Sequence, residues 1–144
     1  MSAHCTVLLA EDDENDVLLF STAFRKAGMV NHLATVPDGE DAIEYLKGTG
    51  VYSDRVRYPL PDLLITDLKM PKRTGFDLLT WIKSQEQLKD LPIVVLTSSA
   101  EESDQRRALE LGAQACWTKP SHFEDLVQIV HRIQDDWLAP LNQL

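Results

Sequence analysis

The chain has 144 residues, which is enough for one domain with a hydrophobic core and too few for two ordinary domains. Its formal net charge of -9 argues against a nucleic-acid-binding protein, because a phosphate backbone requires a basic face, and favours a basic protein partner or divalent cations. The two cysteines, Cys5 and Cys116, form no disulfide or zinc pattern, which indicates a reducing compartment. Acidic residues 11–13 interrupt the first apolar run at once, so we expect a cytoplasmic protein without a membrane span.

Short apolar segments alternate with longer amphipathic ones along the chain. Residues 6–10 are almost uniformly apolar, as expected for a strand buried on both faces. Apolar side chains then recur every three or four residues from Val17 onward, which predicts a helix capped by Asn15 and ended by Gly28. Further strands are predicted at about 32–36, 63–65, 92–96 and 115–118, and further helices from 42 to 48, after Gly75, before Gly112 and from 123 to 137.

This alternation predicts an α/β fold with a doubly wound parallel sheet. Right-handed crossovers between parallel strands place helices on both faces of the sheet. In such sheets, binding sites form beyond the carboxyl ends of the strands. The residues that follow each strand therefore indicate where the chemistry lies.

Charged and hydroxyl side chains follow four of the predicted strands. The first strand ends in Glu11-Asp12-Asp13, the third in Asp67, the fourth in Thr97 and the fifth in Lys119. Converging carboxylates repel one another unless a cation neutralises them, and a few hard oxygen ligands suit Mg²⁺. Each feature alone has an ordinary structural explanation, such as a helix N-terminus, a turn or a surface charge. Their joint occurrence at four strand ends favours a functional site.

The segments at these strand ends resemble the CheY-like receiver domains of two-component response regulators. The matching segments are residues 8–13, 64–71 with Gly75 following, 95–99 and 118–120. The resemblance runs in the correct order from about residue 5 to 135. It implies five parallel strands in the order 2-1-3-4-5, flanked by five helices. It also implies that residues 1–144 form a single receiver domain, in which 136–144 extend the last helix.

The resemblance implies a role for each site residue. Asp67 would accept a phosphoryl group from a sensor histidine kinase, and Thr97 and Lys119 would bind the phosphoryl oxygens. The Lys119–Pro120 peptide bond would be cis. The protein would promote its own phosphorylation and dephosphorylation without being a turnover enzyme, and would control a downstream partner through its fourth helix, fifth strand and fifth helix. The implied Mg²⁺ ligands are Asp13, Asp67, the backbone carbonyl of Lys69 and, through water, Asp12.

One position departs from the family pattern. Many receivers carry Tyr or Phe three residues before the lysine, where this chain has Cys116. The neighbouring Trp117 is expected on the opposite face of the strand, because side chains alternate along it. Two interpretations of Cys116 stay open, a small buried hydrophobic residue and a redox-sensitive thiol. In either case the usual aromatic switch is weakened or replaced.

Two further segments are unusual. Residues 48–61 form a longer connection than most receivers have, which either packs its tyrosines locally or contacts a partner through its two arginines. This segment and the C-terminal end resemble single-domain regulators of the cyanobacterial phytochrome-associated type, which implies a phytochrome-type or hybrid kinase. The apolar tail residues Trp137, Leu138, Leu141 and Leu144 would form an association patch if exposed, and so predict a homodimer through the last helix and tail.

Two other functions compete with phosphorylation-switched signalling. A receiver-like scaffold could bind partners without phosphorylation, although the intact set of site residues argues against it. A phosphatase of the haloacid dehalogenase type also uses an aspartyl nucleophile, but it needs a second Asp two residues later, where this chain has Lys69. Such an enzyme also needs a cap domain, for which the chain has no room.

Overall fold

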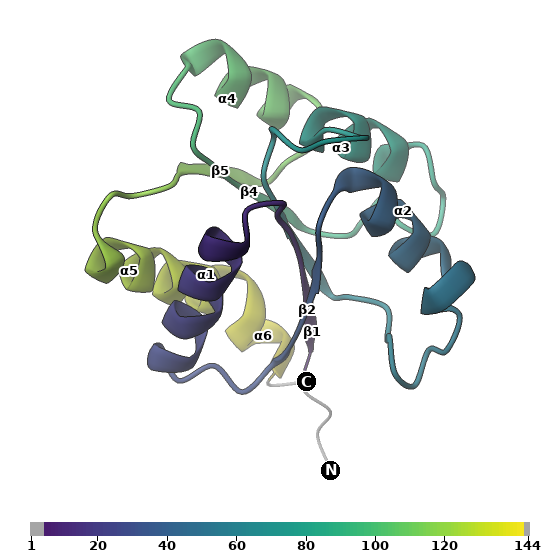
Figure 1. The fold of residues 1–144 in the computed structure, drawn as a ribbon, viewed down its shortest axis with the longest axis horizontal. Coiled ribbons are helices and arrows are strands. Elements are labelled where there is room, and N and C mark those ends of the chain that lie inside the picture. Colours follow the sequence, from purple (N-terminus) through teal and green to yellow (C-terminus); the bar gives the residue numbers. More distant parts are fainter. Residues whose placement is uncertain (1–4, 143–144) are drawn as a thin grey trace.

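A five-stranded parallel sheet forms the centre of the computed structural model, which describes residues 5–142 (Figure 1). The strand order is β2-β1-β3-β4-β5, which confirms the predicted topology. The three central strands, β1, β3 and β4, are completely buried, in agreement with their apolar sequences. The strands are β1 (Thr6–Ala10), β2 (His32–Val36), β3 (Leu63–Thr66), β4 (Ile93–Thr97) and β5 (Ala115–Thr118).

Five helices cover the two faces of the sheet. Figure 1 shows α1 (Glu14–Lys26) and α5 (Phe123–Ile133) on one face. It shows α2 (Gly39–Lys47), α3 (Gly75–Lys83) and α4 (Glu102–Glu110) on the other. These five helices confirm the predicted fold class.

Each face of the sheet has its own hydrophobic core, because side chains alternate along each strand. Leu8 pairs with Leu64 in the strand register, and both belong to the core under α2, α3 and α4. The adjacent pair, Leu9 and Ile65, belongs to the core under α1 and α5. On β5, Cys116 packs on the first core and Trp117 on the second, which confirms their opposite orientation. Burial raises the pKa of the Cys116 thiol.

Helix α1 begins earlier than predicted. Asp13 is its N-cap, and the Asp13 carboxylate accepts the backbone N–H groups of Asn15 at 2.8 Å and Asp16 at 3.1 Å. The prediction of Asn15 as N-cap was therefore wrong. Asp13 directly follows the turn out of β1 and carries a full negative charge, which the helix dipole favours at this end.

The long connection between α2 and β3 packs on itself. Its short helix η1 (Gly50–Tyr52) brings Tyr52 next to Tyr45 and Tyr58, with ring centroids 5.2 to 5.9 Å apart. The Arg55 guanidinium donates to the carbonyls of Tyr45, Leu46 and Tyr58 at 2.7 to 3.1 Å. Local packing of the tyrosines is thus confirmed. Arg55 holds the loop against the end of α2, because it binds backbone carbonyls of both.

The C-terminal segment folds back onto the core under α1 and α5. The last helix was expected to run to residue 137, but α5 ends at Ile133 and continues as a π-helical turn, η2 (Gln134–Leu138), and a short α6 (Ala139–Asn142). Pro140 has no N–H to continue the regular helical ladder, which accounts for the irregular turn before it.

Two of the four apolar tail residues, Trp137 and Leu138, have side chains that the structure describes. Leu138 is completely buried and Trp137 is half-buried against the same core, because the irregular turn bends the chain back toward the sheet. Leu138 therefore contributes nothing to an exposed patch, and Trp137 is only partly available for one. The side chain of Leu141 and all of Leu144 lie outside the described residues.

Among residues 5–142, no helix is long and apolar enough to cross a membrane. Cys5 and Cys116 form no disulfide with each other; Cys5 is buried and Cys116 is half-buried.

Candidate functional site

The parallel register brings the strand ends to one edge of the sheet. The backbone N–H of Glu11 donates to the Val36 carbonyl at 3.0 Å, and the N–H of Asp67 donates to the Ala10 carbonyl at 3.1 Å. The N–H of Lys119 donates to the Thr97 carbonyl at 2.7 Å. These bonds extend the sheet ladder by one residue beyond each strand, so the side chains that follow the strands have fixed positions.

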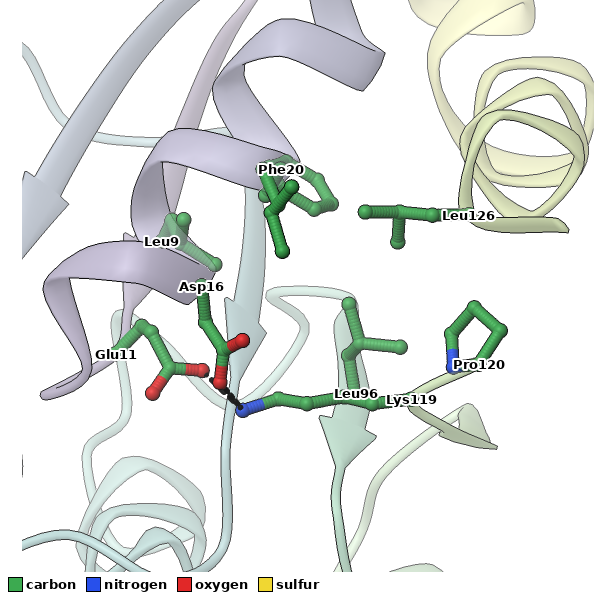
Figure 2. A pocket seen from close by; sticks show the side chains of 9 residues that line it. Leu9, Glu11, Asp16, Phe20, Leu96, Lys119, Pro120 and Leu126 are labelled. Atoms are coloured by element: carbon green, nitrogen blue, oxygen red, sulfur yellow. Dashed lines mark hydrogen bonds and ion pairs between the residues drawn. The ribbon is translucent and has the colours of Figure 1, made fainter. Parts of the chain in front are cut away.

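The Lys119 ammonium lies among three carboxylates. Its Nζ donates to Glu11 Oε1 at 2.5 Å, to Asp16 Oδ2 at 2.8 Å and to Asp67 Oδ2 at 2.9 Å. Figure 2 shows the Lys119 side chain extending toward Glu11 and Asp16. Since a lysine ammonium has three N–H donors, the three bonds use its full capacity. The Lys119 side chain is only 16% exposed, so these bonds are largely shielded from water.

A group of three carboxylates could hold a metal ion. Oxygen atoms of Glu11, Asp12 and Asp67 all lie within 4.8 Å of one another. Glu11 and Asp67 are buried, whereas Asp12 is exposed. The structure therefore brings together two of the predicted metal-site carboxylates, Asp12 and Asp67, and adds Glu11.

Asp13, predicted as a direct metal ligand, lies outside this group. Its carboxylate instead accepts the N–H groups of the first turn of α1. In the run Glu11-Asp12-Asp13, the structure therefore places Glu11 rather than Asp13 beside Asp12 and Asp67. The sequence pattern that points to Glu11 is its place directly after a buried strand. Its backbone N–H there continues the hydrogen bonding of the sheet by one residue.

Backbone contacts hold the Asp67 carboxylate in a fixed orientation. Its Oδ1 accepts the N–H of Leu68 at 2.6 Å and that of Lys69 at 3.5 Å. Gly75 lies so close that a Cβ atom there would be 2.2 Å from the Asp67 carbonyl oxygen. The start of α3 thus packs directly against Asp67, and only glycine leaves room for this approach.

Thr97 connects the site to helix α4. Its hydroxyl oxygen accepts the N–H of Ser99 at 3.1 Å, and the Ser99 hydroxyl donates to Asp104 Oδ2 at 2.7 Å. The Lys69 ammonium lies 3.5 Å from the same Asp104 oxygen. The hydrogen bond from Ser99 and the charge of Lys69 lower the pKa of Asp104. Lys69 and Ser99, which follow Asp67 and Thr97 by two residues, therefore meet at Asp104 in the first turn of α4.

Burial and the hydrogen bonds of Lys119 shift the pKa values of Glu11 and Lys119. Burial raises the pKa of Glu11 to about 7, and the hydrogen bond from Lys119 offsets only part of this effect. Burial alone would lower the pKa of Lys119, but its bonds to Asp16, Glu11 and Asp67 outweigh burial and raise it. Lys119 is therefore a permanent cation that neutralises one of several converging carboxylates.

The peptide bond between Lys119 and Pro120 is trans, since residues 5–142 contain no cis peptide bond. The cis form implied by the resemblance was therefore wrong for this chain. The trans form is the lower in energy for an Xaa–Pro bond, and with it the lysine still reaches Asp67.

Comparisons with known proteins agree with this arrangement. Residues 7–131 match the family described as response regulator receiver domain. The chain belongs to this family. The receiver is 35% identical to the "Probable methanogenesis regulatory protein FilR2" of Methanothrix harundinacea, over 92% of this chain and 83% of that protein. It is 33% identical to the response regulator Rcp1 of Synechocystis, over 92% of this chain and 88% of that protein.

Solved structures of receivers have the same fold. The phosphorylated cyanobacterial phytochrome response regulator RcpA superposes with a TM-score of 0.87 at 35% identity, over 96% of each chain. The Mn²⁺-bound form of Rcp1 superposes with a TM-score of 0.83 at 33% identity, over 93% of this receiver and 94% of that chain. The receiver is thus a regulatory domain of two-component signalling and not a metabolic enzyme.

Proposed function

We propose that the whole chain, residues 1–144, is a single-domain response regulator that accepts a phosphoryl group on Asp67 from a sensor histidine kinase in the cytoplasm. The observation that carries the proposal is the buried Asp67 carboxylate, which lies 2.9 Å from the Lys119 ammonium inside an acidic group at the edge of the sheet. A nucleophile, a fixed cation and candidate metal ligands are the parts that phosphoryl transfer to a carboxylate requires.

The transfer step uses the residues of the site as follows. A carboxylate oxygen of Asp67 attacks the phosphorus of a phosphohistidine, the P–N bond breaks, and its electron pair returns to the imidazole. Asp67 then carries the phosphoryl group as an acyl phosphate. Lys119 pairs with a phosphoryl oxygen, since it already lies 2.9 Å from Asp67, and the Thr97 hydroxyl donates to another, since Thr97 ends β4, the strand next to β3.

The acidic group fits a divalent cation. Glu11, Asp12 and Asp67 would hold Mg²⁺ together with the backbone carbonyl of Lys69, which follows Asp67 by two residues. Hard oxygen ligands and an excess of carboxylates over ammonium groups both favour such an ion. When bound, the ion neutralises charge on the transferred phosphoryl group. Asp13 supports this set indirectly, because it caps the helix that begins beside it.

The signal would leave the site through α4 and not through an aromatic switch. Thr97 contacts the N–H of Ser99, and the Ser99 carbonyl accepts Gln105 Nε2 at 3.2 Å. The same Gln105 nitrogen donates to the Thr118 hydroxyl of β5 at 2.8 Å. A shift of Thr97 toward a phosphoryl oxygen would therefore disturb the polar contacts that fix α4 against β5. These contacts would do the work of the aromatic residue that many receivers carry at the position of Cys116.

The kinase partner is proposed to be phytochrome-linked, as the name of the similar cyanobacterial phytochrome response regulator RcpA suggests. The downstream partner would be a protein that contacts the surface of α4, β5 and α5. Association of two copies through the last helix and tail stays a prediction, to which Leu138 does not contribute because it is buried in its own chain.

One experiment tests the proposal. The protein is incubated with Mg²⁺ and acetyl phosphate, and intact mass spectrometry measures the gain of a phosphoryl group. We expect the wild type to gain one such group and Asp67→Asn to gain none, because the amide is not a nucleophile for phosphorus. The Asp13→Asn variant serves as a control for lost acidic charge near the site, since Asn also caps helices.

A phosphorylation-independent scaffold predicts a different result. In that case the wild type would stay unmodified even with its metal site saturated. A haloacid dehalogenase-type phosphatase would instead turn over added phosphate esters. The Lys69 ammonium, 3.5 Å from Asp104, occupies the position where such an enzyme needs a second Asp.

A further inference from the structure

Asp16 is the one partner of Lys119 that receiver chemistry leaves without a role. It lies in the first turn of α1, and its Oδ2 accepts from Lys119 Nζ at 2.8 Å (Figure 2). The other two partners, Glu11 and Asp67, belong to the acidic group proposed to bind the metal ion, and Asp16 does not. Acidic residues in a first helical turn are ordinarily explained by the helix dipole, which is why the sequence did not single out Asp16.

The local structure fixes the position of Asp16. Its backbone N–H donates to the Asp13 carboxylate at 3.1 Å, so the capping residue also orients the turn that carries Asp16. Its side chain is 33% exposed, and the Lys119 side chain is 16% exposed. The contact is therefore a partly shielded ion pair between the first turn of helix α1 and the residue that follows strand β5.

The surroundings of Lys119 offer no substitute for Asp16. The pocket between α1 and α5 is lined on this side by Phe20, Leu96 and Leu126, as Figure 2 shows. Of the carboxylates that line this pocket, Glu11 is committed to the acidic group, and Asp16 is not. When a cation engages Glu11 and Asp67, Asp16 is therefore the remaining anion of the three that can hold the ammonium.

We propose that Asp16 is a positioning residue that keeps the Lys119 ammonium at the phosphoryl site while Glu11 and Asp67 are engaged by the metal ion. The inference rests on the proposed function of Asp67. Asp16 does not touch the reacting atoms; it acts through Lys119. Its negative charge matters less than its acceptor oxygen, because the role is to hold one N–H of the ammonium in a fixed direction.

The rate of phosphorylation by acetyl phosphate at saturating Mg²⁺ tests the inference. Asp16→Ala should lower this rate about tenfold, the usual effect of losing one hydrogen bond to a charged group, and Asp16→Asn should stay within about threefold of the wild type. Glu14→Ala is the matched control, because it removes the same charge from the same turn at an exposed position. It should react at the wild-type rate.

A double-mutant cycle shows whether Asp16 acts through Lys119. In a Lys119→Ala background, the further change Asp16→Ala should alter the rate less than about twofold, because the shared interaction is already lost. An Asp16→Ala variant that reacts at the wild-type rate, or that is slowed equally without Lys119, would overturn the inference while leaving Asp67 as the acceptor. A wild type that gains no phosphoryl group overturns the proposed function and this inference together.

A second measurement does not depend on phosphoryl transfer. Competitive acetylation with acetic anhydride in the presence of Mg²⁺, followed by peptide mass spectrometry, reports the reactivity of the Lys119 amine. Asp16→Ala should raise this reactivity, because the protonated amine loses the acceptor oxygen that holds one of its N–H groups. Equal reactivity in Asp16→Ala and the wild type contradicts the inference even if the variant is less stable.

Discussion

At the scale of single residues, the site holds more carboxylates than its one ammonium can neutralise. Glu11 is the carboxylate of this site whose pKa is raised, to about 7, and the main cause is its burial. The sequence correctly indicated Asp67, Thr97 and Lys119 as strand-end residues, since the end of a buried strand is visible in the apolar pattern. It could not distinguish Glu11 from Asp13, because a shift of one residue after a strand decides whether a side chain faces the site or caps the next helix.

The Glu11 shift predicts how stability changes with pH in the absence of metal. Between the ordinary value of 4.5 and about 7, the folded protein binds a proton that the unfolded chain has lost. The contribution of Glu11 to the free energy of unfolding therefore falls as the pH rises through this window. The glutamine of Glu11→Gln does not titrate, so the free energy of unfolding of this variant does not fall for this reason. Its stability relative to the wild type should therefore increase as the pH rises.

Urea unfolding in the presence of a chelator measures this difference across the window. A constant difference between Glu11→Gln and the wild type would show that the Glu11 carboxyl is not protonated in the folded protein. Asp12→Asn is the control, because the Asp12 side chain is exposed at the same acidic group.

At the scale of elements, the end of α2 depends on a distant arginine. Gly48 closes the helix in the left-handed conformation, with φ of 71°, and Arg55 reaches back to the carbonyls of Tyr45 and Leu46. The glycine stop was visible in the sequence because glycine is favoured in this conformation. The role of Arg55 was not visible in the sequence. A side chain ten residues after Tyr45 can reach many acceptors, and only the fold of the loop determines which carbonyls it binds.

Arg55→Ala should lower the free energy of unfolding by about 1 to 3 kcal/mol, because buried carbonyls at the end of α2 lose a charged donor. Arg57→Ala is the matched control. Its guanidinium lies 5.6 Å from the Tyr58 ring centroid and the residue is exposed, so its loss should cost less than about 1 kcal/mol. Equal losses in urea unfolding would mean that Arg55 does not fix the loop in solution.

At the scale of the whole molecule, the C-terminal segment is part of the receiver and not an appendage. The sequence showed that Trp137 and Leu138 are apolar but not what they contact, because a π-helical turn changes the direction of a helix without a clear pattern of its own. Since η2 and α6 return to the core under α1 and α5, the hydrophobic interior extends beyond the residues that match the family, 7–131.

Leu138→Ala tests this docking. Loss of a fully buried leucine should lower the free energy of unfolding by about 2 to 5 kcal/mol. Leu109→Ala, on α4 and 49% exposed, should change it by less than about 0.5 kcal/mol. Similar small losses in both variants, measured by urea unfolding, would show that the tail does not pack on the core in solution.

The division of the interior by the sheet also separates the three tryptophans of the chain. Trp81 packs on the core under α2, α3 and α4, whereas Trp117 and Trp137 pack on the core under α1 and α5. Each side of the molecule therefore carries its own intrinsic fluorophore. Single-tryptophan versions of the chain would report separately on the side that carries the α4 contacts and on the side that carries the tail, without any attached dye.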